Sequence, residues 1–592
     1  MTDFDGANEG RVIVITDCGS TTTKAILIEK TNGVYRQVCR GESPTTVEAP
    51  VEDVTVGVKR ALKDLTAISG RQLIDEKNNI IRPARGKVGC DWYISTSSAG
   101  GGLQMAVLGL VKNISASSAL KAALGAGAIV TESIAIDDEK DTLDQVARLR
   151  RLRPDMVLLA GGTDGGQTTG VVELAELLAL AEPQPRFGDR FQLPVVYAGN
   201  RDVRDEIGQI LSKTAKVIHT ENVRPTVEAE TLTFARDRIH SLFLEHVMQQ
   251  APGFSKLLAL CDTDVMPTPS AVGKMLQLLG EKQGINALCV DIGGATTDVF
   301  SVMHGQFNRT VSANLGMSYS AAFVLKECGL ENIMRWLPVE MDEGELLNQV
   351  MNKTVRPTTI PDTEEALMVE QALAREALRM SLAQHTAFAH DLKGAVTERN
   401  IDGGFSSGQA AKWRMANVNL LIGSGGVLSH APSEMQTVAM LVDAFLPEGI
   451  TVIAKDSVFM MPHLGVLSGM DENAALEVFF NDCVIPLVTS VAPTGRWKAG
   501  QSILSYRFVS ESGQQWSGTL QWGELRMCRA PDRGVLTLTP VRHVDVGFGP
   551  GKPGTISIET SRLGILFDGR SRPLVNRDAD LWQSFFEEWP NE

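Results

Sequence analysis

Two pairs of short apolar runs, far apart in the chain, repeat one pattern of hydrophobic and polar positions. In the first pair, runs at 12–16 and 25–28 enclose the polar, glycine-containing stretch DCGSTTTK at 17–24. In the second pair, runs at 288–290 and 299–302 enclose DIGGATTD at 291–298. Apolar runs joined by a tight glycine turn are typical of β-hairpins. The pattern therefore predicts two copies of one strand–turn–strand device.

The residues of these two turns are suited to hold a polyphosphate and its metal. Glycine lets backbone N–H groups approach an anion closely, hydroxyls add donors, and an aspartate at a strand end can hold a hydrated Mg²⁺. We expect metal and catalytic roles for Asp17 and Asp291, and a water-positioning role for Asp298. The candidate phosphate-binding residues are Gly19, Ser20, Thr21, Thr22 and Lys24 in the first turn, and Gly293, Gly294, Thr296 and Thr297 in the second. A strand lysine that points into solvent is an equally compatible interpretation of Lys24.

Strand and helix patterns alternate strictly from about Cys90 to His219, which predicts a doubly wound parallel sheet. We expect its first strand at DWYIST (91–96) and its first helix at LQMAVLGLVKNI (103–114). Glycine-rich turns at 97–102 and 161–166 fall where such sheets bind ligands, but neither is a Walker A loop. A second ligand site and tight turns without a ligand are both compatible with this pattern.

The remaining chain is helical and then rich in β-structure. Residues 221–250 are interpreted as one long helix with a proline near its start, and 314–400 are mostly helical by periodicity. From Asn417 the pattern is a buried strand, a glycine turn and a helix start. From about Pro493 polar and apolar residues alternate at period two, which predicts a small antiparallel β domain.

Composition and charge narrow the class of protein. The chain has 592 residues, a formal net charge of −15 and 43% hydrophobic residues, a length that predicts several domains. The acidity argues against a nucleic-acid partner, which requires clustered Lys and Arg. No apolar stretch is long enough to span a bilayer, and the polar start lacks the features of a secretory signal.

The eight cysteines are scattered, with no CxxC pair. This spacing suits reduced thiols and gives neither a zinc site nor an iron–sulfur site, so we expect a cytoplasmic protein. Cys18 lies inside the first turn, and we interpret it as a small filler residue.

A third glycine turn, LIGSGG at 421–426, follows the two hairpins and again comes after an apolar strand. Three such turns in this order resemble the two phosphate turns and the adenosine turn of the actin, sugar-kinase and heat-shock chaperone ATPase superfamily. The resemblance implies an α/β fold in which two ribonuclease H-like lobes close on ATP. It further implies contacts to adenine and ribose from Gly423, Ser424, Gly425 and Gly426.

Segments along nearly the whole chain resemble the glutamate-mutase-associated MutL (GlmL) family. They are STSSAGGGLQMAVLGLV at 95–111, LLAGGTDGG at 158–166, VMPTPSAV at 265–272 and GRSRPL at 569–574. The family implies an ATPase encoded with adenosylcobalamin-dependent mutases of the glutamate mutase or aminomutase type. The mutase would be its protein partner, and the ATPase would be the chaperone or reactivating factor of that mutase. ATP or ADP and Mg²⁺ would be the cofactors. Cobalamin contact stays open, because the Asp-x-His-x-x-Gly cobalamin-ligand signature of mutases is missing.

Pattern and resemblance together divide the chain into five parts. They are the start of the first ATPase lobe (1–88), an inserted flavodoxin-like or Rossmann-like parallel α/β domain (89–220), a helical return to the ATPase core (221–286), the second lobe with the adenosine turn (287–490), and a C-terminal β-rich domain (491–592). The inserted domain would lie where reactivases of this fold carry partner-binding insertions.

Other functions of the same fold are compatible with these motifs. A small-molecule kinase is the main enzymatic alternative, although no Asp general base in a sugar-binding loop can be located. An activator of a radical dehydratase should carry a cysteine pair for an iron–sulfur cluster, and none is suitably spaced. A non-hydrolysing actin-like scaffold is the third alternative. If the protein is a switch, we expect slow hydrolysis, because closure and opening of the lobes would act on the partner.

Overall fold

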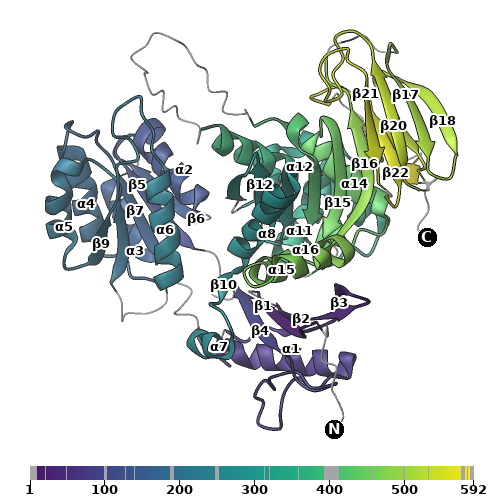
Figure 1. Ribbon diagram of the computed structural model, residues 1–592. Coiled ribbons are helices and arrows are strands. Elements are labelled where there is room, and N and C mark those ends of the chain that lie inside the picture. The colour runs from purple at the N-terminus through teal and green to yellow at the C-terminus, as the bar shows by residue number, and fades with distance from the viewer. Residues whose placement is uncertain are drawn as a thin grey trace, which may run out of the picture.

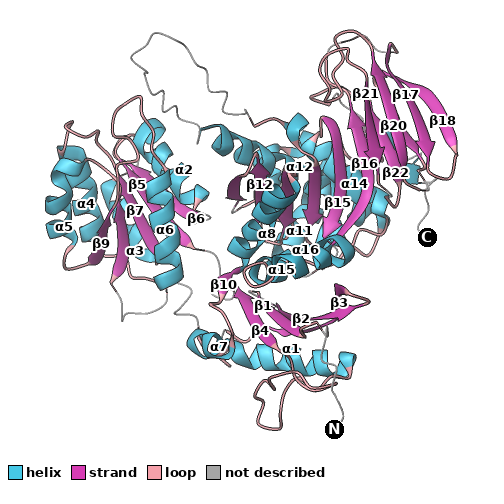
Figure 2. Ribbon diagram, in the orientation of Figure 1, coloured by secondary structure: helices cyan, strands magenta, loops and turns pink. Residues whose placement is uncertain are grey.

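The structure is a computed structural model whose two lobes carry an inserted α/β domain and a C-terminal β-rich part (Figures 1 and 2). It describes residues 10–19, 22–47, 50–98, 103–126, 128–138, 141–186, 192–246, 252–312, 314–318, 320–357, 359–391, 413–456, 458–495, 497, 500–530, 532–559, 561–574, 581–582 and 585–586. Two of the expected phosphate-binding residues, Ser20 and Thr21, lie outside the described residues.

The sheet of the first lobe has the strand order β10-β4-β1-β2-β3. An antiparallel meander of β1 (Ile13–Cys18), β2 (Thr22–Thr31) and β3 (Val34–Pro44) is extended by β4 (Trp92–Ser97) and β10 (Met266–Pro267), which run parallel to β1. Helix α1 (Val54–Ser69) packs on the meander, and α8 (Thr268–Gln283) follows β10 directly. The cap of α1 explains its start, because the Asp53 carboxylate accepts the Thr55 N–H at 3.0 Å.

The second lobe repeats this arrangement. Its meander is β11 (Ala287–Ile292), β12 (Thr297–Met303) and β13 (Gln306–Ser312), followed by β14 (Leu420–Ser424) and β15 (Gly449–Asp456) running parallel to β11. Helix α15 (Met461–Leu467) follows β15, as α8 follows β10. The same order of strands occurs twice, which is the duplication of ribonuclease H-like lobes in the actin-like ATPase fold.

Among the described residues between β13 and β14, the second lobe has four further α-helices: α9 (Ala321–Cys328), α10 (Leu330–Met334), α11 (Glu343–Val355) and α12 (Glu364–Asp391). Helix α12 packs on β12, β13 and α14 (Glu434–Phe445). The remaining helices of this lobe are α13 (Gly426–Ser429) and α16 (Glu472–Val478).

The inserted domain is a five-stranded parallel sheet in the order β6-β5-β7-β8-β9, a flavodoxin-like order. Its strands are β5 (Gln104–Gly109), β6 (Ile129–Ala135), β7 (Met156–Ala160), β8 (Leu193–Tyr197) and β9 (Ala215–His219). Helices α2 (Ser117–Gly125), α3 (Thr142–Leu152), α4 (Thr169–Ala181), α5 (Arg204–Leu211) and α6 (Thr233–His246) belong to this part, with helices on both faces of the sheet (Figure 2). The short helix α7 (Phe254–Leu260) leads the chain back to the first lobe.

Three local expectations about this region are wrong. The DWYIST strand pairs with β1 and belongs to the first lobe, so the inserted sheet begins only at β5. The segment expected as the first helix is instead strand β5, because its apolar run is buried between helices on both faces and short apolar runs suit either element. The single long helix expected at 221–250 is shorter, since α6 begins at Thr233.

The C-terminal strands are divided between two sheets rather than forming one separate domain. β17 (Ser502–Ser510), β18 (Gln515–Gln521), β20 (Gly534–Pro540) and β21 (Gly554–Ile558) make an antiparallel sheet. β16 (Val484–Ala492), β22 (Gly564–Asp568) and β19 (Leu525–Cys528) instead extend the sheet of the second lobe. The two sheets share one core, in which Phe508 and Phe567 are buried.

The two lobes are joined by a common hydrophobic core. Ile13 and Ile94 of the first sheet pack in the same cluster as Leu464 of α15 and Leu276 of α8. Helix α15 lies between the two sheets and contacts both β1 and β4 (Figure 1). The second lobe therefore places the beginning of α15 next to the first turn.

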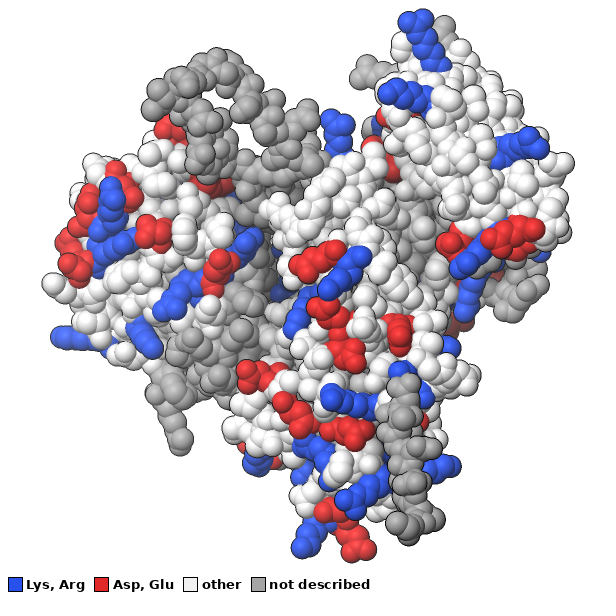
Figure 3. All heavy atoms as spheres, in the orientation of Figure 1, with Lys and Arg blue, Asp and Glu red and all other residues white. Residues whose placement is uncertain are grey.

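The surface of this acidic protein carries both acidic and basic side chains. On the face shown in Figure 3, acidic and basic side chains are interspersed over both lobes rather than gathered in a field of one sign. Within the described part of the chain, no helix has the length and apolar character needed to cross a membrane.

Candidate nucleotide site

The two glycine turns have the same backbone hydrogen bond. The Gly19 N–H donates to the Thr22 carbonyl at 3.1 Å, and the Gly293 N–H donates to the Thr296 carbonyl at 2.8 Å. These two glycine amides are therefore occupied within their own turns. Because the closing bond of each tight hairpin uses them, these amides do not add to the case for phosphate binding at Gly19 and Gly293, which stays a prediction.

The second turn is held from behind by a segment that the motifs did not indicate. The Met317 and Ser318 N–H groups donate to the carbonyls of Gly293 and Gly294, both at 2.9 Å. The Ser320 hydroxyl donates to the Ala295 carbonyl at 2.6 Å. Within the described residues, the amides of Gly294 and Ala295 make no hydrogen bond. Because the carbonyls are held on one side of the turn, these two amides remain as donors for an anion.

The Thr297 side chain points into the core of the second lobe. Its hydroxyl is fully buried and donates to the Leu315 carbonyl, so it fastens the turn to the supporting segment. Thr23 in the first hairpin is also buried and bonds the Thr45 hydroxyl, which in turn donates to the Gly19 carbonyl. Strand alternation directs this side chain into the core, so the phosphate-binding role expected for Thr297 stays a prediction that its position does not favour.

Asp17 is buried at the end of β1 and is oriented by two hydroxyls. Its Oδ1 accepts from the Thr96 hydroxyl of β4 at 2.8 Å and from the Thr268 hydroxyl of α8 at 2.6 Å. The sequence offered no signal for these partners beyond their positions at element ends. Only the parallel pairing of β1 with β4 brings Thr96 and Asp17 together.

Asp291 ends β11 among other carboxyl groups. Its pKa is raised to about 7, first by burial and then by Asp298 and Asp456, while Lys24 opposes this rise. A carboxyl in this environment favours either a proton or a cation nearby.

Its neighbours Asp298 and Asp456 are each held by the protein. Asp298, directly opposite Asp291 on β12, accepts two hydrogen bonds from Arg309 at 3.0 and 2.7 Å. Asp456 at the end of β15 is fully buried and accepts the N–H groups of Met460 and Met461 at the start of α15. Burial raises the pKa of Asp456, and these N–H groups oppose the rise.

Lys24 reaches toward the second lobe. It is the cross-strand partner of Asp17, and its ammonium lies 5.4 Å from the centre of the Phe459 ring. Its charge acts on Asp291 and Asp456. This placement favours an electrostatic role over the alternative of a strand lysine in solvent.

The residues of the third turn have different positions. A Cβ at Gly423 would meet the Leu441 and Leu428 side chains, so Gly423 packs against the core, a position that does not favour its expected nucleotide contact. Gly425 has φ 103° and lies against the Ile292 backbone, a close approach that only glycine allows. Ser424 is fully buried, and its hydroxyl has no hydrogen-bonding partner in the described structure. Gly426, at the start of α13, is exposed and has open space beside it.

A cavity of about 700 Å³ joins the second and third turns. Gly293, Gly294 and Gly426 line one part of it, and apolar residues including Val427 and Leu367 line another. A turn with unpaired amides beside an apolar wall is an arrangement that suits a nucleotide.

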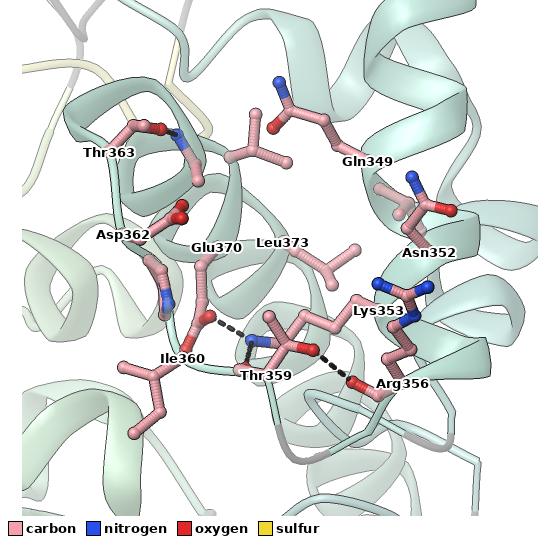
Figure 4. A pocket seen from close by; sticks show the side chains of 14 residues that line it. Gln349, Asn352, Lys353, Arg356, Thr359, Ile360, Asp362, Thr363, Glu370 and Leu373 are labelled. Carbon is pink, nitrogen blue, oxygen red and sulfur yellow. Dashed lines mark hydrogen bonds and ion pairs between the residues drawn. The ribbon is translucent and has the colours of Figure 1, made fainter.

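A second cavity of about 560 Å³ adjoins the first, between α11 and α12 (Figure 4). The Lys353 ammonium on α11 pairs with the Glu370 carboxylate on α12, and both residues line both cavities. Gln349 and Asn352 line the second cavity from α11 (Figure 4). The ion pair is thus part of the wall between the two cavities.

The carboxylates of this site suit a hydrated divalent cation better than a metal ion that is enclosed by protein ligands alone. Among the described residues, no group of three or more His, Cys, Asp or Glu side chains is arranged to hold a metal. Asp17 and Asp291 provide two hard carboxylate donors, and Mg²⁺ commonly keeps several waters beside one or two carboxylates and phosphate oxygens. The residues present therefore fit Mg²⁺ bound together with a nucleotide.

Two further features are structural. Cys18 is fully buried, and burial raises the pKa of its thiol strongly, in agreement with a filler role.

In the inserted domain, the amide of Asn222 donates to the Gly162 carbonyl at 3.0 Å and to Asp164 at 2.9 Å. These bonds brace the glycine-rich turn from the segment that follows β9, and they favour the alternative of a tight turn without a ligand.

Comparisons with known proteins add the following. A sequence model described as MutL protein matches residues 13–483. Protein MutL from Clostridium tetanomorphum is 32% identical over 440 residues, which cover 71% of this chain and 86% of that protein.

Two solved structures show distant likeness. An activator of the 2-hydroxyisocaproyl-CoA dehydratase from Clostridium difficile with bound ADPNP has 9% identity and a TM-score of 0.26, covering 78% of this chain and 95% of that one. A carbohydrate kinase from Novosphingobium aromaticivorans has 11% identity and a TM-score of 0.29, covering 79% and 92%. Likenesses this distant do not indicate what the present chain acts on.

Proposed function

Because this chain belongs to the MutL protein family, we propose that it binds ATP between its lobes, hydrolyses it slowly and acts on another protein. The observation that supports nucleotide binding most is the cavity of about 700 Å³ bounded by Gly293, Gly294 and Gly426. Its volume lies within the range of about 300–1,000 Å³ that is usual for small-molecule sites.

In this proposal, the chain's own groups hold the phosphates in place. The unoccupied amides of Gly294 and Ala295 bind phosphate oxygens, and fixed donors of this kind stabilise charge that develops during phosphoryl transfer. Thr22 and Thr296 close the two turns through their carbonyls. The apolar wall with Val427 receives the nucleoside.

The carboxylates have separate roles. Asp17 and Asp291 would hold Mg²⁺, and the ion would supply charge neutralisation at the phosphates. Lys24 adds positive charge from the first lobe. Asp298, whose orientation Arg309 holds, positions the attacking water from the far side of the second turn.

We further propose that the client is an adenosylcobalamin-dependent mutase of the glutamate mutase or aminomutase type. Family membership supports this choice. The protein would act as its chaperone or reactivating factor, with movement of the lobes transmitted through the inserted domain. Slow hydrolysis would set how long the client stays engaged.

The experiment combines three assays on the full chain. Phosphate release from ATP is measured alone, with a panel of small acceptors, and with a mutase inactivated by bound hydroxocobalamin. We expect slow release, no phosphorylated acceptor, and recovery of mutase activity that requires ATP. Equal recovery without ATP would remove the reactivating role.

Two outcomes would favour the other functions. A phosphorylated small molecule would identify a kinase, and nucleotide binding without any phosphate release would identify a scaffold. The variant Asp291→Ala should lose Mg·ATP affinity by at least about tenfold, whereas Asp144→Ala, an exposed aspartate of α3, should not. Unchanged affinity in Asp291→Ala would contradict the assignment of the site.

A further inference from the structure

Two histidines of the second lobe are fully enclosed by protein but differ in their partners. His385 of α12 is 0% exposed, and both ring nitrogens are bonded, Nδ1 to the Thr310 hydroxyl at 3.0 Å and Nε2 to the Ser301 hydroxyl at 2.8 Å. His463 of α15 is 1% exposed, and neither ring nitrogen has a hydrogen-bonding partner in the described structure. Buried polar atoms are nearly always paired, so His463 requires an explanation.

The position of His463 points to the nucleotide site. It lies near the start of α15, where Asp456 accepts the N–H groups of Met460 and Met461. Helix α15 contacts β1 and β4 of the first lobe. The charged groups that act on the ring are Asp17 and Lys24, which are cross-strand partners on β1 and β2.

The chemistry of the ring matches this pair. The ring is enclosed by protein, which favours its neutral form. A neutral imidazole has one N–H donor and one acceptor nitrogen. Asp17 offers an acceptor and Lys24 a donor, and both groups belong to the first hairpin. The backbones of Lys24 and Met460 also lie close to the ring, in a geometry that makes no hydrogen bond.

We propose that His463 is a positioning residue of the nucleotide site, which bonds the Asp17–Lys24 pair when the lobes close on a metal–nucleoside triphosphate. A residue of the second lobe would thereby hold the first turn in register with the second. This inference rests on the proposed nucleotide binding. It assigns the unpaired ring a use that the folded chain without nucleotide does not supply.

The test compares His463→Leu with His385→Leu, two substitutions of buried histidine by an apolar residue of similar size. Without nucleotide, His463→Leu should keep or raise the melting temperature, because it removes unpaired polar atoms. His385→Leu should lower it, since the hydroxyls of Thr310 and Ser301 lose their partner. Thermal unfolding of the apo proteins measures both effects.

Nucleotide binding supplies the second readout. His463→Leu should weaken Mg·ATP binding by about tenfold or more, with a smaller effect on ATP in EDTA, and His463→Gln should restore part of the loss. Unchanged Mg·ATP affinity in His463→Leu, or an apo destabilisation as large as that of His385→Leu, would overturn the proposal. If the wild-type chain itself binds no ATP, the proposed function fails instead, so the two failures are distinguishable.

Discussion

Gly465 of α15 lies so close to Ala271 of α8 that any side chain at position 465 would overlap the Ala271 backbone. The two helices follow β10 and β15, the equivalent strands of the two repeats, so this contact is where the repeated halves of the fold meet. Close approach of two helix backbones requires glycine at the crossing. The distance between the lobes therefore depends on residue 465 being a glycine.

The Gly465→Ala variant should force α15 and α8 apart. Because the clash is with backbone, which cannot move aside cheaply, we expect a lower melting temperature by several degrees and weaker Mg·ATP binding. Gly208→Ala in α5 is the matched control, since a Cβ there meets only the His219 ring edge at 3.9 Å. Alanine is the better helix former by roughly 1 kcal/mol, so the control should be neutral or stabilising. A Gly465→Ala protein as stable as wild type would contradict the tight crossing.

Gly426 provides a test of the cavity without disturbing the fold. A Cβ at this position meets nothing within 4 Å, and the residue lines the cavity of about 700 Å³. Gly426→Leu should therefore fold normally but reduce ATP affinity by about tenfold or more, because the side chain occupies the proposed ligand volume. Calorimetric titration and a melting curve separate the two effects. Gly208→Leu should change neither, and normal ATP affinity in Gly426→Leu would place the nucleotide elsewhere.

The raised pKa of Asp291 predicts a pH dependence of binding. Its pKa is about 7, first because of burial and then because of Asp298 and Asp456, and Mg²⁺ binding requires the ionised carboxylate. Mg·ATP affinity should rise about tenfold from pH 6 to pH 8, as the ionised fraction increases. Binding titrations in buffers of matched ionic strength measure this rise. A flat profile over this range would show that Asp291 is not the titrating group.

The same shift affects the stability of the protein without nucleotide. The folded-state pKa of about 7 lies above the reference value of 3.8, so the folded protein binds more protons than the unfolded chain between these pH values. This contribution is fully present below about pH 4 and is lost as the pH rises through 7. The Asp291→Asn variant should not lose this stability as the pH rises, so it should melt at a higher temperature than the wild-type protein at pH 8. Equal melting temperatures would indicate that the carboxylate is already neutralised in the apo protein.

A buried ionic network ties the C-terminal part to the second lobe. The Arg570 guanidinium, 1% exposed, donates to Asp568 and to Asp443 of α14, and Asp443 also accepts from Arg375 of α12. Removing one member leaves an unpaired buried charge, so Arg570→Met should cost about 3–5 kcal/mol of folding free energy. Chemical unfolding measures the loss.

The matched control for this network is an exposed ion pair. Arg533 and Glu559 are 61% and 69% exposed, so Arg533→Met should change stability by less than about 1 kcal/mol.

A chain ending at residue 490 should fail to fold, because β22 and β19 complete the sheet of the second lobe. A cooperative transition in that truncated chain would contradict an integral C-terminal part.

The sequence by itself determined the two hairpins, their terminal aspartates and the parallel character of the inserted sheet, because these depend on local alternation and turn chemistry. It did not determine which sheet DWYIST joins, since a buried parallel strand has the same apolar pattern in either place. Strand β10, with two residues, is too short to produce a pattern at all.

The tertiary structure alone decided the environment of the site. Thr268 and His463 reach the surroundings of Asp17 from elements that begin about 250 and 450 residues later in the chain, so no local spacing could indicate them. Glycines and threonines that look equivalent in the motifs also have different surroundings in the fold. Gly423 and Thr297 lie in the core, whereas Gly426 lines the cavity. The physical reason is that hydrogen bonding and burial around a side chain depend on packing between distant segments, whereas the pattern of the sequence reports only its neighbours.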